Sequence, residues 1–246
     1  MGKKFRQSRA TRVTTVSVVT AGLVVFTLAA SAASLGGINV GSLFTQETPV
    51  TIEIPDPPGP IVFTDFSGCV NRIDGWEDAS GAIWISHSGG WQCLGNNGVR
   101  AQQRVPLGNA TVVIPYSTGI RVSTDIFDIS HQSNRSGPGL SLLNDGSGNF
   151  VYVIYERDQD RVTIGVGSGG VDTPLFQITP AFSDLDSGTM SVELNGTVLD
   201  LTFGGQDFGP YDLVEATPLL GNTRFGLVAD HDNFSTFNSF TIELLP

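Results

Sequence analysis

The sequence predicts an all-β fold, an antiparallel sandwich of two sheets that follows an N-terminal signal or anchor segment. From Ile61 to Pro246, apolar and polar residues alternate with period two in about a dozen short segments, as in strands with one buried face. Gly, Asn, Asp and Pro separate these segments, and no amphipathic helical pattern occurs. Many short strands joined by such turns are typical of an antiparallel sandwich or barrel.

An export segment is expected at residues 1–33. A basic stretch, MGKKFRQSRATR, precedes a mostly apolar run from Val13 to Ala33 that ends in small residues of the A-x-A type, as in a secretory signal peptide. The run of about 21 residues is also long enough to span a bilayer. A cleaved signal peptide and an uncleaved membrane anchor therefore both remain open. Either places the remainder outside the cytoplasm, extracellular or on the cell surface, with membrane contact only through this segment.

Residues 34–60 are expected to form an extended linker. Five of the twelve residues from Pro49 to Pro60 are proline, which is excluded from helix interiors and central strands. Proline-rich segments of this kind act as stiff spacers. The sandwich domain is therefore assigned to residues 61–246.

Single strands are predicted where apolar or alternating runs lie between turn-forming residues. The first, Val62–Phe66, ends in an acidic-aromatic pair. The last, Phe240–Leu244, has an apolar residue at every second position. Further strands are predicted at Ala82–Ser86, Gly98–Val105, Ala110–Pro115, Gly119–Ser130, Gly139–Asn144 and Phe225–Asp230.

Two hairpins are predicted from alternation on both sides of a turn signal. In Met190–Phe203 the turn is assigned to the Asn195-Gly196 pair, which supplies the positive φ angles of a type I′ turn. In Asn149–Val166 the turn is assigned to Asp158–Asp160. Both segments present apolar residues on one side of each strand, as half-buried hairpins do.

Cys69 and Cys93 are the only cysteines. In an exported chain an even number of cysteines favours a disulfide. Their spacing and number exclude a CxxC redox pair and a cysteine zinc site. A structural disulfide closing a loop of about 25 residues is therefore predicted.

Three features resemble the laminin-G-like or concanavalin A-like jelly-roll family. The domain opens with Val62–Gly68 followed by a tryptophan segment, has a central Asn-Gly hairpin at Val192–Leu201, and closes with Gly226–Glu243. The resemblance covers about residues 61–246 and implies that the first and last strands lie side by side. The family contains lectins, glycanases and adhesion modules, so the resemblance implies a fold and leaves the activity open.

The charge of the chain argues against nucleic acid as a partner. From Ser34 onward there are 8 Arg, no Lys and 24 acidic residues, a formal charge of −16. Such a surface repels phosphate backbones.

A candidate ligand site lies between the two cysteines, where three tryptophans occur within sixteen residues. An aromatic ring that packs on the apolar face of a sugar, with a few polar groups beside it, can bind carbohydrate. Trp84 lies in an apolar strand and is expected in the core, whereas for the other two a core and a surface position both remain open. The candidate binding residues are Trp76, Trp91, Gln92, Asn96 and Asn97.

The polar cluster Asp230–Asn233 lies where one predicted strand ends. Asp and Asn are favoured in turns because their side chains accept hydrogen bonds from nearby backbone N–H groups, so a turn is the favoured interpretation. The alternative is a Ca²⁺ site with Asp230, Asp232 and Asn233 as ligands, although Ca²⁺ takes six to eight oxygens. The segment Asn144–Asn149 is likewise interpreted as a hairpin loop rather than a calcium loop. No cofactor is expected to be required.

No catalytic residues are predicted. The glycanases of the resembled family carry glutamates in a Glu-x-Asp-x-x-Glu arrangement, and the nearest segment here is Asp125-Ile-Phe-Asp128. In a regular strand these two aspartates point to opposite faces. The histidines, His87, His131 and His231, are far apart in sequence.

The sequence therefore predicts a secreted or cell-surface, non-catalytic module that binds a glycan or another component of the cell envelope. Two alternatives remain. One is a structural component that assembles through its sheet edges or its spacer, and the other is a hydrolase acting on polysaccharide.

Overall fold

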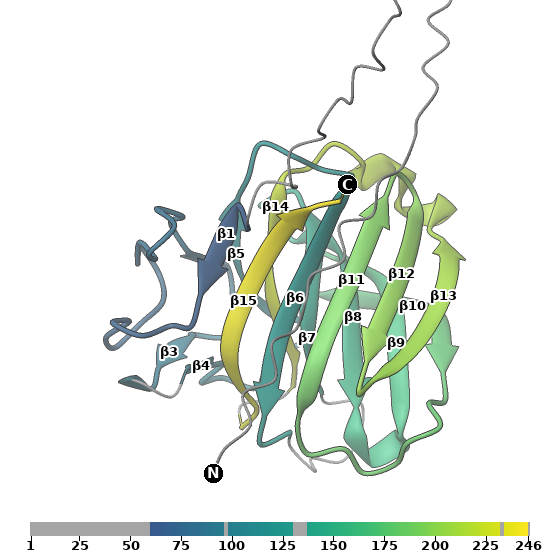
Figure 1. Cartoon of the computed structure of the whole chain (residues 1–246), viewed down its shortest axis with the longest axis horizontal. Coiled ribbons are helices and arrows are strands. Elements are labelled where there is room, and N and C mark those ends of the chain that lie inside the picture. Colours follow the sequence, from purple (N-terminus) through teal and green to yellow (C-terminus); the bar gives the residue numbers. More distant parts are fainter. Residues whose placement is uncertain (1–59, 96–97, 130–136, 232–233, 246) are drawn as a thin grey trace, which may run out of the picture. The chain divides into compact units, whose positions relative to one another are not determined.

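The computed structural model describes residues 60–95, 98–129, 137–231 and 234–245. These residues form two antiparallel sheets packed face to face, which confirms the predicted fold class (Figure 1). Two short 3-10 helices, Arg157–Gln159 and Val214–Leu219, accompany the strands. Within the described ranges no helix combines the length and hydrophobicity needed to cross a membrane. The export segment and the linker up to residue 59 lie outside the described residues.

The larger sheet has eight strands. Seven follow the order β13-β12-β11-β6-β15-β4-β3, and β1 pairs with β15. Their bounds are β1 Val62–Thr64, β3 Gln92–Cys93, β4 Val99–Arg100, β6 Ile120–Phe127, β11 Gly188–Asn195, β12 Val198–Phe203, β13 Gln206–Asp212 and β15 Thr236–Leu244.

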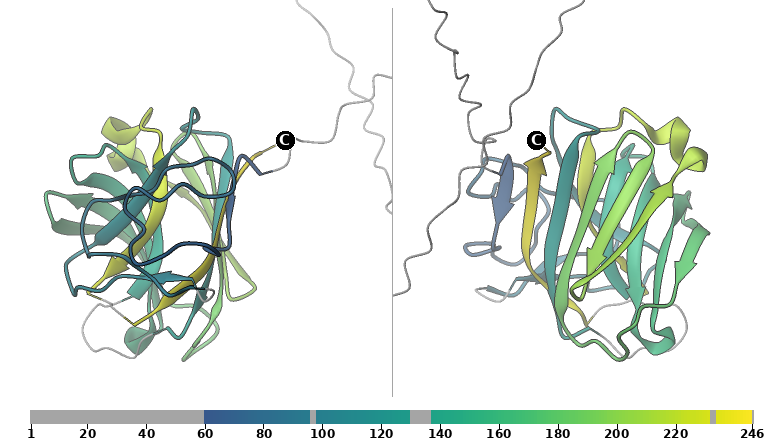
Figure 2. Two further views of the ribbon diagram at one scale, coloured as in Figure 1. Left: turned by 90° about the vertical axis from the view of Figure 1, so that its left-hand side faces the viewer. Right: turned by 45° about the vertical axis from the view of Figure 1, so that its right-hand side comes forward.

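The smaller sheet has seven strands in the order β10-β9-β8-β7-β14-β5-β2. Figure 2 shows the two sheets from the side and at an angle. The bounds in this sheet are β2 Ile85–Ser86, β5 Gly108–Val113, β7 Gly137–Asn144, β8 Asn149–Glu156, β9 Arg161–Ser168, β10 Val171–Ile178 and β14 Arg224–Asp230.

The first and last strands lie side by side, as the resemblance implies. Val62 lies opposite Ile242 in an antiparallel register, and the N–H of Ile61 donates to the carbonyl of Ile242 at 2.8 Å. The chain therefore enters and leaves the sandwich on neighbouring strands of the larger sheet.

Both predicted hairpins are present, as β11–β12 and β8–β9. In the first, Asn195 pairs with Val198, so the central turn residues are Gly196 and Thr197, one position later than predicted. Only Gly196 of this pair has a positive φ, at 64°. Gly at the first central position is the pattern of a type II′ turn, because glycine adopts positive φ without a steric cost.

Three strands were missed, and four were predicted too long: β1, β2, β4 and β6. Of the segment Gly98–Val105 only Val99 and Arg100 pair, as β4. The strands β3, β10 and β13 lack a clean period-two pattern; β10 and β13 end their sheets, carry largely exposed residues and each contains a proline. Edge strands need no continuous apolar face, so alternation does not reveal them.

The main core lies between the sheets and contains Trp84, as predicted, with Ile83 directed outward at 55% exposure. The Trp84 ring packs against Phe66 and Phe240, with centroids 5.4 and 5.0 Å apart. Its Nε1 donates to the buried carboxylate of Asp78 at 3.1 Å. A buried indole N–H needs such a partner.

The strand β8 is buried on both faces. One face, with Val151, belongs to the main core, and the other belongs to a separate apolar cluster on the outer side of the smaller sheet. The members of this outer cluster are Leu107, Phe150, Tyr152, Ile154 and Val228.

The predicted disulfide joins Cys69 and Cys93, with a Cα–Cα distance of 5.5 Å. Both residues are buried, at 0% and 6% exposure. The bond closes a segment that contains β2 and β3, the short strands at one end of each sheet.

Candidate functional site

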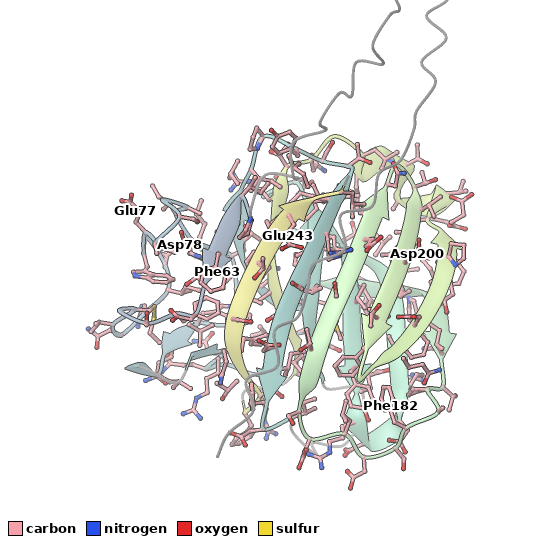
Figure 3. All side chains as sticks on the ribbon, viewed as in Figure 1. Phe63, Glu77, Asp78, Phe182, Asp200 and Glu243 are labelled. Carbon is pink, nitrogen blue, oxygen red and sulfur yellow. A yellow bond between two sulfur atoms is a disulfide. The ribbon has the colours of Figure 1, made fainter. Side chains whose placement is uncertain are left out.

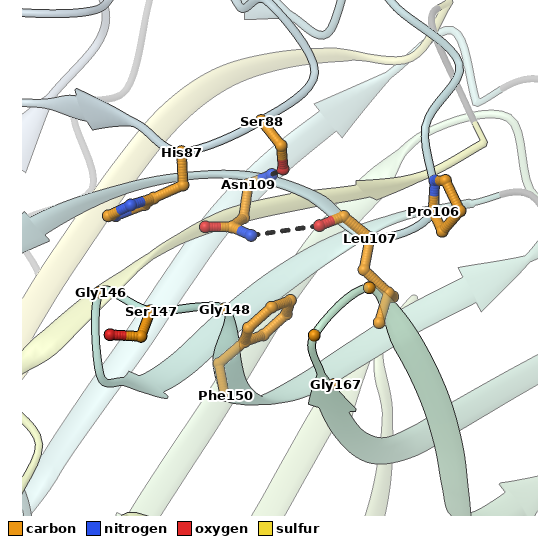
Figure 4. A pocket seen from close by; sticks show the side chains of 12 residues that line it. His87, Ser88, Pro106, Leu107, Asn109, Gly146, Ser147, Gly148, Phe150 and Gly167 are labelled. Atoms are coloured by element: carbon orange, nitrogen blue, oxygen red, sulfur yellow. Dashed lines mark hydrogen bonds between the residues drawn. The ribbon is translucent and has the colours of Figure 1, made fainter.

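A pocket of about 380 Å³ opens on the outer side of the smaller sheet (Figure 4). It lies beside Phe150, which alternates along β8 with the core residue Val151. Four separate segments of the chain supply its walls. The lining residues are His87, Ser88, Pro106, Leu107, Asn109, Gly146, Ser147, Gly148, Phe150, Gly167, Gly169 and Gly170.

One wall carries His87 and Ser88, which directly follow β2. The Nε2 atom of His87 is hydrogen-bonded to the Thr111 hydroxyl at 2.9 Å, and its backbone N–H donates to the Asn109 carbonyl at 3.0 Å. The indole Nε1 of Trp91 donates to the Ser88 carbonyl at 2.9 Å. The wall is therefore held to the sheet at one end and to a buried ring at the other.

The Asn109 side chain forms part of the floor and is 3% exposed. Its Nδ2 donates to the Leu107 carbonyl at 3.1 Å, and its Oδ1 accepts from Asn144 Nδ2 at 3.2 Å. The amide bridges β5 to the end of β7 across the intervening strand β14. These bonds fix its orientation before any ligand arrives.

The opposite wall is the Asn144–Asn149 loop, which joins β7 to β8 as the predicted hairpin loop. The carboxylate of Asp145 accepts from the backbone N–H groups of Ser147 and Asn149 at 2.6 and 3.1 Å, and from Asn149 Nδ2 at 2.6 Å. Burial raises the pKa of Asp145, but these hydrogen bonds outweigh that effect and the pKa lies below its ordinary value. The carboxylate is thus used to shape the loop.

The third wall, Pro106 and Leu107, is held by Asp230. Its Oδ1 accepts from the Leu107 N–H at 3.0 Å and lies 2.9 Å from His231 Nδ1, while the His231 N–H donates to the Val105 carbonyl at 3.0 Å. Burial raises the pKa of Asp230, and the bond from Leu107 opposes that rise. This carboxylate fixes the loop beside the pocket.

The electrostatic character of the pocket is nearly neutral. Burial lowers the pKa of His87, and the positive charge of Arg224 lowers it further, while Asp74 and Asp145 act in the opposite direction. His87 is therefore an uncharged imidazole at neutral pH. Its Nε2 already bonds Thr111, and the remaining polar wall groups are hydroxyls, an amide and backbone groups.

Trp91, a predicted ligand-binding residue, is buried in the structure. This side chain is 1% exposed and packs against Phe237, with ring centroids 5.5 Å apart, so its ring cannot meet a ligand. Trp76 is half-buried, 6.0 Å from the Phe66 ring, and Gln92 is half-buried in β3. None of the three lines the pocket. Asn96 and Asn97 lie outside the described residues.

Of the three proposed calcium ligands, only Asp230 lies within the described residues. Asp230 is 4% exposed and its carboxylate is occupied as above, whereas Asp232 and Asn233 lie outside the described ranges. Within those ranges no cluster of three or more His, Cys, Asp or Glu side chains is placed to hold a metal ion.

The aspartates considered for hydrolysis lie on other surfaces. Asp125 is on the outer face of the larger sheet, where it accepts from the Ser239 hydroxyl at 2.8 Å and from the Thr189 hydroxyl. Asp128 follows the end of β6 with a φ of 51°, so it is not part of the regular strand on which its orientation was predicted.

A second depression, of about 620 Å³, lies on the outer face of the larger sheet. It is bordered by charged side chains, including Arg121, Glu193 and Asp200, and Figure 3 places Asp200 and Glu243 on this face. Arg121 pairs with Glu193 and Glu243. These two ion pairs satisfy the charge of Arg121 at the surface.

Sequence reasoning missed the pocket that the structure forms. Its walls contain five glycines and two serines, residue types that indicate turns rather than chemistry. The available signal was a repeated short motif, Gly146-Ser-Gly148 and Gly167-Ser-Gly-Gly170, at the ends of neighbouring strands.

No protein-family model and no curated protein sequence matches this chain. Among solved structures, it is similar to the carbohydrate binding module CBM66 from Bacillus subtilis, with a TM-score of 0.51 and 16% identity over 65% of this chain and 94% of that one. The exoplasmic domain of VIP36, in a Ca²⁺- and Man3GlcNAc-bound form, aligns with a TM-score of 0.46 and 10% identity over 75% and 91% of the two chains. The galectin LEC-6 of Caenorhabditis elegans aligns at 0.42 and 16%, over 54% and 89%.

At these identities the likeness concerns the fold alone. The described residues form a concanavalin A-like jelly-roll sandwich. A pocket opens on the outer side of its smaller sheet, and a charged depression lies on the outer side of its larger sheet.

Proposed function

We propose that this protein is an exported, secreted or cell-surface module that binds carbohydrate without catalysing its hydrolysis, and that the pocket beside Phe150 is the binding site. The observation that carries this proposal is the set of neutral hydrogen-bonding groups, from His87, Ser88 and Ser147, fixed around one small pocket. No cofactor takes part in this proposal.

The chemistry of the walls suits a polyhydroxylated ligand. Sugars present many hydroxyl groups that both donate and accept, and small-molecule sites meet such groups with a few fixed polar atoms among apolar ones. Here Phe150 and Leu107 line the pocket as an apolar floor that is only 3% and 2% exposed. The hydroxyls of Ser88 and Ser147 supply polar atoms. The glycines let a ligand approach the backbone closely.

The rigidity of the walls supports binding because little conformational entropy is lost when a ligand enters a preformed site. Asp145 and Asp230 fix two loops through backbone hydrogen bonds. Trp91 fixes the third through Ser88. Trp91 thus stabilises the proposed site through this hydrogen bond from the core, although its ring does not line the pocket.

The similarity to CBM66 adds weight to this proposal, because that structure is described as a carbohydrate binding module. We also propose that the domain is related to laminin-G-like domains, as the sequence pattern implies. A hydrolase on this fold would need two carboxylates about 5–10 Å apart across one bond, and among the described lining residues of the pocket there is none.

The proposal is tested with the purified full chain on a glycan array, followed by calorimetric titration of the best saccharide with Ca²⁺ and with EDTA. Ser147→Trp fills the pocket from an exposed position and is expected to weaken binding at least tenfold. Ser191→Trp, in the depression on the opposite sheet, is the matched control and is expected to bind normally. Binding that survives Ser147→Trp, or an array without any bound saccharide, contradicts the proposal.

A further inference from the structure

The pocket is uncharged although the protein is strongly acidic. The chain has 24 acidic and 13 basic residues, a formal charge of −11. Of the twelve described residues that line the pocket, only His87 can ionise. The side chain of His87 is held neutral by burial and by Arg224. A charged ligand group would therefore meet no opposite charge among these described lining residues.

The carboxylates of Asp145 and Asp230, beside two of the walls, are bound to backbone groups. Asp145 is bound to the N–H groups of its own loop, and Asp230 to the Leu107 N–H and to His231. Neither residue is part of the lining. They shape two walls, and both carboxylates are already hydrogen-bonded within the protein.

The nearest cation is also outside the lining. Arg224 lies behind the Asn144–Asn149 loop, so that a Cβ added at Gly146 would be 3.2 Å from its Nε. Asp74 and Asp145 oppose its influence at His87. The Nη1 of Arg224 is buried and has no hydrogen-bond partner among the described residues. Because it is shielded from the pocket, a ligand carboxylate would not contact it directly, and the net negative charge of the protein would repel that carboxylate.

The size of the pocket restricts ligand length. Ligand pockets commonly range from about 300 to 1,000 Å³, and a volume of about 380 Å³ is near the lower limit. Four segments of the chain border this small space. A short saccharide segment fits such a site better than a long stretch of polymer.

We propose that the pocket selects a short, uncharged saccharide unit and discriminates against uronic acids and amino sugars. This inference rests on the proposed carbohydrate-binding function. The physical reason is that a charged group removed from water without a partner loses solvation that nothing replaces, whereas hydroxyls exchange bonds with water for bonds with Ser88, Ser147 and the backbone.

The test uses pairs of trisaccharides in which one group on each sugar unit is either neutral or charged, titrated calorimetrically into the full chain at low and at physiological salt. The pairs are galactotriose with trigalacturonate, and cellotriose with the glucosamine trimer. We expect at least one neutral trimer to bind and its charged counterpart to bind at least tenfold more weakly. A charged member that binds as tightly as its neutral counterpart overturns the inference and leaves the proposed function standing. If no member binds, the proposed function itself fails for these sugars.

Two further measurements address the cause of the selection. Ser147→Arg places a cation in the pocket and is expected to improve trigalacturonate binding about tenfold, whereas Ser191→Arg, on the opposite sheet, is not. Thermal unfolding of both variants verifies that they fold. Absence of any gain in Ser147→Arg contradicts a selection based on charge. A neutral hexamer that binds more than about tenfold tighter than the trimer contradicts the short-ligand part.

Discussion

Asp230 is an acid whose side chain the fold keeps almost entirely from water, at 4% exposure. Its carboxylate accepts from the Leu107 N–H, which would otherwise be a buried donor without a partner. Burial raises the pKa of Asp230 above the value of 3.8 that it has in an unfolded chain. The residue thus holds a pocket wall while its charged form is disfavoured by burial.

The raised pKa of Asp230 predicts that the free energy of unfolding depends on pH. Between its unfolded and folded pKa values, Asp230 binds more protons in the folded state than in the unfolded one, so its contribution to the free energy of unfolding decreases as the pH rises. Asn at this position keeps an accepting oxygen but does not titrate. The unfolding free energy of the wild type, relative to Asp230→Asn, is therefore expected to be constant below about pH 3.8 and to fall above it.

Denaturant unfolding between pH 3 and pH 8 measures that difference. Asp200→Asn is the control, because Asp200 is exposed on the larger sheet (Figure 3) and its replacement reports the general effect of removing one negative charge. A difference between wild type and Asp230→Asn that stays constant or rises with pH would contradict the assignment of a raised pKa.

The burial of Trp84 could be predicted from the sequence, whereas the burial of Trp91 could not. Trp84 lies within the apolar run Ala82–Ser86, so its burial follows from its neighbours. Trp91 lies between glycines and a polar residue, which gives no preference. Its burial depends on Phe237, a contact from a distant part of the chain that local pattern does not contain.

At the scale of elements, the disulfide links the pocket to the stability of the domain. It closes the segment from Cys69 to Cys93, which contains His87 and Ser88. Cross-linking removes conformational entropy from the unfolded chain, by about 3 kcal/mol for a loop of about this length. The same link restrains the pocket wall.

The double variant Cys69→Ser and Cys93→Ser is therefore expected to lower the unfolding free energy by about 3 kcal/mol and to weaken ligand binding several-fold. Denaturant titration and calorimetry measure the two effects. Wild type with and without reductant is the comparison that involves no substitution. Unchanged stability in the variant would contradict a structural role for the bond.

Local pattern was sufficient for hairpins and insufficient for the pocket. The β11–β12 hairpin was predicted because Val192 and Leu201, paired in the structure, are also close in sequence. The pocket instead requires β5 and β7 to flank β14, so that segments near residues 88, 107, 147 and 169 meet. Such long-range pairings determine which turns become neighbours, and they cannot be predicted from the positions of Gly and Ser residues alone.

At the scale of the whole molecule, the open edges on one side of the sandwich are β10 and β13. Contact between Phe176 and Tyr211, with centroids 4.9 Å apart, joins these two strands. Each carries an exposed proline, Pro174 or Pro210. Proline lacks an N–H and therefore weakens the addition of another strand. This disfavours assembly through these edges.

Replacing Pro174 by Thr restores a backbone donor on β10 and is expected to increase concentration-dependent self-association several-fold. Sedimentation velocity over a concentration series measures the effect. Gln177→Thr, on the same strand and also exposed, is the matched control. Identical sedimentation of wild type and Pro174→Thr would show that proline does not prevent strand addition at this edge.

The pairing of β1 with β15 has a consequence for protein architecture. Because Ile61 and Ile242 are hydrogen-bonded neighbours and Leu245 follows shortly after, the two ends of the sandwich can attach to a single point on another polypeptide. The domain is therefore geometrically suited to insertion within a surface loop of a host protein, and to circular permutation in which a short peptide joins its original ends.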